Sequence, residues 1–295
     1  MLRLAAALLA AVAISTPQPQ VLFVVINRGD ELAIEPVAWV TKTPGPCDGC
    51  WRVRFEDALR NDDVPDDVFS ERYYRHGRTY RVLTGGFEAG TATVDKPTSL
   101  GCVSLAATVK ITPPLPQYWP ALAVGSLHVP PRKTDRLEVT AEEEKALSAL
   151  ARREFRKRGV PAALVAKTEG TDLISIDLNH DGQRDLIGSF EAADKEHEYR
   201  DHQQVLDEHR LFLIAMGDGA GGYRTDYVWY FDLKAGTNEA HTETMRPIDT
   251  LDLDEDGTDE IIASTSYYES NDYQILKRGR NGKWTIVYRG GGSGC

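Results

Sequence analysis

Two stretches of the sequence share one acidic pattern, D-x-[DN]-x-D-G-x-x-[DE], and they start 75 residues apart, at Asp177 and Asp252. Apolar segments rich in β-branched residues flank both stretches, so each predicts a strand–loop–strand unit. Glycine at the sixth position permits the sharp turn that such a loop needs. The matched pattern predicts an internal repeat of β-structure, and this feature constrains the C-terminal half of the chain most strongly.

The residue types in both stretches are those that bind Ca²⁺. This ion takes six to eight oxygen ligands at about 2.3–2.6 Å, and the side chains of a tight loop can surround it. We name residues 177–185 the first loop and residues 252–260 the second loop. The predicted ligands are Asp177, Asn179, Asp181, Gln183 and Asp185 in the first loop, and Asp252, Asp254, Asp256, Thr258 and Glu260 in the second. The sequence predicts two Ca²⁺ sites, and the alternative is two acidic turns without metal.

An EF-hand opens with the same pattern but also needs an acidic ligand at position 12 and a helix on each side. Position 12 is Gly188 in one stretch and Ala263 in the other, and the flanking segments read as strands. The pattern therefore indicates strand–loop–strand calcium sites and excludes EF-hands.

The number of carboxylates predicts which of the two sites binds Ca²⁺ more tightly. The first loop has three carboxylates and the neutral Asn179, whereas the second has four, with Glu255 and Asp259 beside them. Affinity rises with ligand charge, and crowded carboxylates repel one another when no ion is bound. We expect from this count that the second loop binds Ca²⁺ more tightly and depends on it more.

The two loops and their strands resemble the FG-GAP/VCBS-type repeats of secreted bacterial proteins and integrin β-propellers. The resemblance lies within residues 161–295, and the tail from Tyr267 through Trp284 to Cys295 also looks like the end of secreted bacterial proteins with such repeats. It implies calcium binding in a β-rich scaffold, and it implies no reaction.

The remaining patterns predict a mainly β protein. We expect an N-terminal β-rich domain at 21–131, one linking helix at 140–159, and a C-terminal domain at 160–295 with two β-propeller-blade-like units. Thr140 and Glu143 form a capping-box pattern at the start of the helix, and Gly159 follows its end. Residues 194–210 are charged and read as a solvated excursion, with a weak metal site at His197 and His202 as the alternative.

The first 15 residues read as a signal peptide. Arg3 precedes an apolar run at 4–14, and an A-x-A-like cleavage site lies at 11–13. We therefore expect an exported protein, periplasmic or extracellular. The formal net charge of −11 disfavours nucleic acid and anionic membranes as partners, and no apolar run is long enough for a membrane span.

These observations favour a calcium-binding module with a binding or structural role. The partner would be an unknown protein or carbohydrate. The sequence contains no recognisable catalytic set, which argues against an enzyme. The main alternative is a secreted, calcium-stabilised hydrolase with its site in the N-terminal region, and a third is a thiol oxidoreductase that uses Cys47 and Cys50.

The chain has four cysteines, Cys47, Cys50, Cys102 and Cys295. An even number in an exported chain indicates two disulfides, for which three pairings are possible. The C-x-x-C spacing of Cys47 and Cys50 also fits a redox or zinc motif, but turn-rich sequence surrounds it.

We expect Cys47 to pair with Cys50, because they are close in sequence, and Cys102 to pair with Cys295 by elimination. In the entropy model, the second bond would raise the free energy of the unfolded chain by about 5 kcal/mol. Peptide mapping without reductant tests the pairing. Four free thiols, or a bond between Cys47 and Cys102, would contradict it.

Overall fold

The computed structural model describes residues 19–28, 31–45, 51–58, 66–100, 103–115, 120–130, 138–194, 199–200, 203–204, 207–238 and 241–294. The predicted signal peptide and all four cysteines lie outside these ranges, as do His197 and His202. The prediction of a mainly β protein is confirmed, because strands make up most of the secondary structure. Among the described helices, none is long and apolar enough to cross a membrane.

The N-terminal part forms a closed antiparallel barrel of six strands in the order β1-β7-β4-β5-β6-β2, with β2 paired back to β1. The end of the 14-residue β2 extends past the barrel and pairs with β3. The elements are β1 (Gln20–Arg28), β2 (Glu31–Pro44), β3 (Trp51–Glu56), α1 (Asp66–Tyr73), β4 (Thr79–Thr84), β5 (Phe87–Leu100), β6 (Val103–Thr112) and β7 (Ala121–Val124).

The interior of the barrel is filled by aromatic and aliphatic side chains. Phe23 of β1 contacts the rings of Tyr74 and Tyr80, and Phe69 of α1 packs against Tyr74. These four side chains belong to one buried cluster. Aromatic rings bury large apolar areas, so this cluster stabilises the closed barrel.

The C-terminal part contains two four-stranded antiparallel meanders. The first sheet has β8 (Glu169–Ile176), β9 (Asp185–Ala192), β12 (Glu208–Gly217) and β13 (Tyr223–Leu233). The second sheet has β14 (Thr244–Leu251), β15 (Glu260–Ser266), β16 (Ser270–Arg278) and β17 (Trp284–Gly294). A small hairpin of β10 (Tyr199–Arg200) and β11 (Gln203–Gln204) lies between β9 and β12 in the chain.

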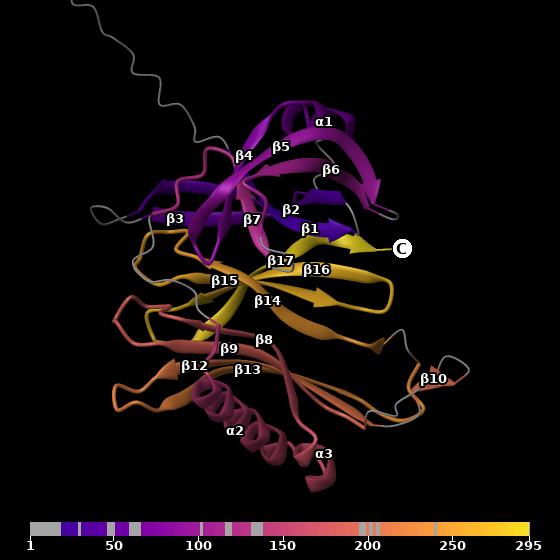
Figure 1. Ribbon diagram of the computed structural model, residues 1–295, viewed down its shortest axis with the longest axis vertical. Helices are drawn as coiled ribbons and strands as arrows, with labels where there is room; N and C mark the ends of the chain where they lie inside the picture. Colours follow the sequence, from indigo (N-terminus) through magenta and orange to yellow (C-terminus); the bar gives the residue numbers. More distant parts are fainter. Residues whose placement is uncertain are drawn as a thin grey trace, which may run out of the picture.

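These parts stack as layers in the order barrel, second sheet, first sheet and helix (Figure 1). Adjacent residues of the second sheet face opposite layers. Ile262 and Ile275 pack against the barrel, whereas Ile261 and Leu276 pack against the first sheet. The second sheet is therefore buried on both faces, which explains why the adjacent residues Ile261 and Ile262 of β15 are both apolar and buried.

Buried polar contacts also join the barrel to the second sheet. The carboxylate of Asp249 accepts hydrogen bonds from the backbone N–H of Gly85 at 2.9 and 3.0 Å. The hydroxyl of Tyr273 donates to Glu35, and the hydroxyl of Tyr288 donates to the carbonyl of Val37. Because buried polar groups need partners, these bonds favour one orientation of the barrel on the sheet.

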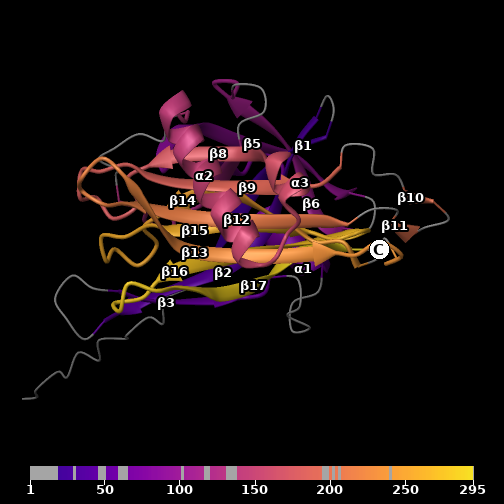
Figure 2. The ribbon, with the colours of Figure 1, turned by 90° about the horizontal axis from the view of Figure 1, so that it is seen from below.

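The predicted helix is present as α2 (Ala141–Lys157), and its capping box forms as expected. The N–H of Glu143 donates to Thr140 Oγ1 at 3.2 Å, and the N–H of Thr140 donates to Glu143 Oε2 at 2.8 Å. The helix covers the outer face of the first sheet with Leu147 and Phe155, and the short α3 (Ala162–Ala166) follows it (Figure 2). It is thus an outer layer of the C-terminal part, because its apolar face needs a partner surface.

The interpretation of residues 194–210 as a solvated excursion is wrong at its C-terminal end. Strand β12 starts at Glu208, and both Glu208 and His209 are buried. The guanidinium of Arg210 forms an ion pair with Glu208 and donates to Thr242 Oγ1 and the carbonyl of Glu243. Burial of Glu208 is thus offset by its ion pair with Arg210, and His209 Nδ1 lies 2.9 Å from the hydroxyl of Tyr230.

The layered arrangement predicts that Ile261→Ala and Ile262→Ala both destabilise the protein, by about 2–5 kcal/mol each. In a sheet with one solvent-exposed face, only one of two adjacent residues would show such a cost. Urea unfolding of each variant measures the effect, and Ile286→Ala, at a residue that is 36% exposed, serves as the control with a smaller cost. A near-zero cost for either Ile261→Ala or Ile262→Ala would contradict the layers.

Candidate metal centre

The two loops have the same backbone conformation. Each connects the first two strands of its sheet, β8 to β9 and β14 to β15. The fourth residue has a positive φ in both, 55° at His180 and 61° at Glu255. The sixth has φ of 87° at Gly182 and 85° at Gly257. A positive φ is rare outside glycine, so the shared pair of values marks the same turn in both repeats.

The first carboxylate of each loop accepts the same two hydrogen bonds. Asp177 accepts from the backbone N–H of Asp181 and Gly182 at 3.1 and 2.9 Å. In the second loop, Asp252 accepts from the N–H groups at the matching positions, both at 3.1 Å. The pattern D-x-x-x-D-G therefore folds the loop around its own first carboxylate.

The ninth residue closes each loop at the start of the following strand. Asp185 accepts a hydrogen bond from the N–H of Leu178 at 2.9 Å, and Glu260 accepts one from the N–H of Leu253 at 2.7 Å. Asp185 also accepts from the N–H of Gly217 at 2.9 Å. These bonds bring the ninth carboxylate beside the second residue of its own loop.

Three predicted ligands of the second loop converge. Asp252, Asp254 and Glu260 each offer a carboxylate oxygen, and these atoms all lie within 4.8 Å of one another. In the first loop, Asn179 stands at the position of Asp254, and its amide donates to Asp181 at 2.9 Å. The seventh residues, Gln183 and Thr258, contribute backbone N–H groups that donate to the fifth carboxylates, Asp181 and Asp256.

Lys277 of β16 is a site residue that sequence reasoning missed. Its Nζ lies 2.7 Å from Asp254 Oδ2, 2.9 Å from Asp256 Oδ2 and 2.7 Å from Glu260 Oε1. No feature of the loop pattern points to a residue this far along the chain. Only the strand register does, because β16 pairs with β15 so that Leu276 lies opposite Ile261.

Burial sets the electrostatics of both loops. It raises the pKa of Asp185 to about 6, with Asp181 and Asp177 adding to the shift against two backbone hydrogen bonds. It also raises the pKa of Asp252. Burial opposes the charge of Lys277, but the carboxylates of Glu260, Asp254 and Asp256 prevail and raise its pKa. Both loops therefore hold desolvated carboxylates, and these favour a nearby cation.

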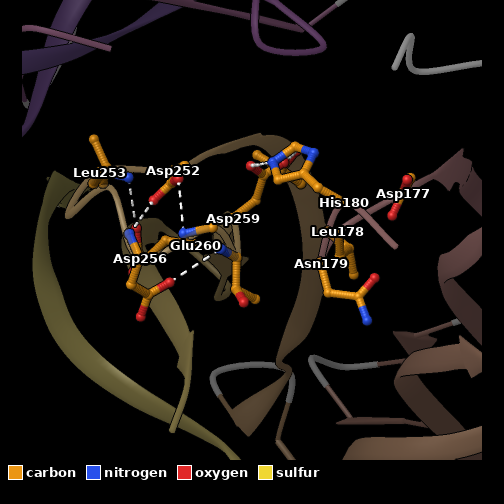
Figure 3. A network of polar contacts seen from close by, with 12 residues as sticks. Asp177, Leu178, Asn179, His180, Asp252, Leu253, Asp256, Asp259 and Glu260 are labelled. Atoms are coloured by element: carbon orange, nitrogen blue, oxygen red, sulfur yellow. Dashed lines mark hydrogen bonds and ion pairs between the residues drawn. The ribbon is translucent and has the colours of Figure 1, made fainter. Parts of the chain in front are cut away.

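The two loops lie side by side and contact each other. The N–H of Asp259 in the second loop donates to the carbonyl of Leu178 in the first at 2.8 Å. His180 Nε2 lies 3.3 Å from Asp259 Oδ1, and Figure 3 shows this side chain turned toward the second loop. Lys42 of the barrel reaches Glu255 at 2.9 Å. Both loops and the barrel thus meet at one end of the stacked sheets.

The donor chemistry fits a hard divalent cation. The predicted side-chain ligands offer oxygen atoms, which Ca²⁺ and Mg²⁺ prefer. Asp254 Oδ1 is buried and has no hydrogen-bond partner within the described part of the chain. The other oxygen of this carboxylate, Oδ2, lies 2.7 Å from Lys277 Nζ, so a cation from the chain already contacts Asp254 on one side.

Comparison with known proteins gives no match: no family model matches the chain, and no curated protein and no solved structure is detectably similar to it. The resemblance to FG-GAP/VCBS repeats therefore rests on the two loops and their flanking strands.

The raised pKa of Asp185 predicts a pH dependence of stability in chelator. Asp185 binds its proton more tightly in the folded protein, with a pKa of about 6 against its ordinary value of 3.8. Its contribution to stability is complete below the lower value and is lost as the pH rises through the higher one. From about pH 4 to about pH 7, the free energy of unfolding of wild type should fall by about 2 kcal/mol relative to that of Asp185→Asn. Urea unfolding at both pH values measures this, and a constant difference would contradict it.

Proposed function

We propose that this protein is an exported calcium-binding β-protein that acts as a binding or structural module. One observation carries the proposal: two loops with a calcium-type pattern share the same turn and the same internal hydrogen bonds, and they contact each other. A pair of unrelated acidic turns would not be expected to share this geometry.

In the first loop, the residues that would hold the ion are Asp177, Asn179, Asp181 and Asp185, with the carbonyl of Gln183. The loop contains Arg184, but within the described ranges no ion pair joins a lysine or arginine to any of its three carboxylates. The ion would supply the positive charge that the buried carboxylates of Asp177 and Asp185 lack. It would thereby stabilise the connection between β8 and β9.

The role as a module rests on the scaffold. Two stacked four-stranded meanders, each with its loop between the first two strands, suit the blade-like units that the resemblance implies. The first loop contacts the second through the hydrogen bond from Asp259 to Leu178, and the second contacts β2 through Lys42. An ion in the first loop would therefore stabilise the end where these layers meet. The partner would be a protein or a carbohydrate. No specific observation favours the hydrolase alternative, and the interior of the barrel is filled by apolar side chains.

The proposal predicts that Ca²⁺ binds to the purified protein and raises its melting temperature. At a concentration 100 times the dissociation constant, the ion should add about 2.7 kcal/mol of stability. Asp177→Ala should abolish uptake by the first loop, because Asp177 also holds the turn through two N–H groups. Calorimetric titration and thermal unfolding in chelator and in Ca²⁺ provide the measurements.

Asp218→Ala is the matched control. Asp218 is an exposed carboxylate in the hairpin between β12 and β13, and it accepts N–H bonds from Ala220 and Gly222. This variant should bind Ca²⁺ as wild type does. Absence of calcium uptake by the wild type, or equal loss in both variants, would contradict the proposed function.

A further inference from the structure

The second loop already contains a cation from its own chain. The Lys277 ammonium has three N–H donors, and three carboxylates lie within 2.7–2.9 Å of its Nζ. Hydrogen bonds between charged groups at such distances are about twice as strong as neutral ones. The lysine side chain is 26% exposed, and β16 lies between β15 and β17 in the sheet. The ammonium is therefore held on a strand that the sheet fixes.

We infer that Lys277 is the resident cation of the second loop, and that under ordinary calcium concentrations the ion binds only in the first loop. This inference rests on the proposed function for the first loop, and it reverses the ranking expected from the number of carboxylates. Ca²⁺ could enter the second loop only if the ammonium left all three carboxylates and moved to solvent. That cost would lower the affinity of the second loop.

The strand register shows that the two repeats differ at this position. In the second sheet Leu276 lies opposite Ile261, which places Lys277 opposite Glu260. In the first sheet Ala215 lies opposite Leu186, which places Met216 opposite Asp185. Met216 is 2% exposed and packs in the apolar cluster between the two sheets. The repeat without the lysine therefore has an uncharged, apolar side chain where the other has an ammonium.

Two further acidic residues of the second loop also have basic partners within the chain. Its fourth residue, Glu255, pairs with Lys42 of the barrel at 2.9 Å, and its eighth, Asp259, faces His180 at 3.3 Å. The positive charge of Lys277 faces Asp254, Asp256 and Glu260. The chain thus supplies partners for most carboxylates of the second loop. The first loop contains Arg184, but in the described part of the structure no ion pair joins a lysine or arginine to its three carboxylates.

Lys277→Met tests the inference, because it installs the residue that the first repeat has at this position. In calorimetric titration of the full chain, wild type should bind one Ca²⁺, and Lys277→Met should bind two. In chelator, Lys277→Met should melt at a lower temperature than wild type, since three carboxylates lose their cation, and excess Ca²⁺ should restore the melting temperature. Lys283→Met, at an exposed residue in the hairpin between β16 and β17, is the matched control and should behave as wild type.

The outcomes separate this inference from the proposed function. One ion in both wild type and Lys277→Met, or two in both, would overturn the inference and leave calcium binding standing. No ion in wild type but one in Lys277→Met would support the role of Lys277 and contradict the proposed function. No ion in either protein would overturn both.

A measurement on wild type covers the case in which Lys277→Met fails to fold. Amine acetylation followed by mass spectrometry should leave Lys277 protected both in chelator and in Ca²⁺, while the exposed Lys283 reacts in both. Labelling of Lys277 that appears only when Ca²⁺ is added would show that the ion displaces the ammonium, and it would overturn the inference.

Discussion

The burial of the second sheet on both faces is the constraint on which the rest of the structure depends. Ile262 and Ile275 pack against the barrel, and Ile261 and Leu276 pack against the first sheet. Apolar packing on both faces leaves little room for charge inside the stack. The carboxylates of the two loops lie where strands end, whereas Asp249 of β14 is buried inside the stack with its own N–H partner, Gly85. The same packing holds these ends together, so that Asp259 reaches the first loop.

Burial near the strand ends makes the charged form of the loop carboxylates less favourable. The carboxylates of the loops lose water, and this raises the pKa of Asp185 and Asp252. In either repeat, a nearby cation would stabilise the charged form of these carboxylates. The second loop receives one from Lys277, whereas the first is the candidate for an ion from solution. Two copies of one sequence pattern would thus obtain a positive charge from different sources. The second loop obtains it from Lys277, and the first from a bound ion.

Local sequence patterns predict the local structure, but they do not predict the contacts between elements that are distant in the chain. The capping box at Thr140 and the strand–loop–strand units follow from neighbouring residues, so the sequence shows them. Closure of the barrel, the order of the layers and the contact of Asp259 with Leu178 depend on strands far apart in the chain. The position of Lys277 could not be predicted for the same reason, because only the pairing of β16 with β15 brings it to Glu260. The charged residues at the start of β12 predict a solvated segment, but Glu208 and His209 are buried because the strand continues through them.

A crystal structure grown in calcium tests most directly the claim that the two loops carry cations of different origin. We expect one Ca²⁺ in the first loop, with Asp177 and Asp185 among its ligands. Lys277 Nζ should still lie among Asp254, Asp256 and Glu260 in the second loop. An ion in the second loop with Lys277 turned toward solvent, or no ion in either loop, would contradict this interpretation.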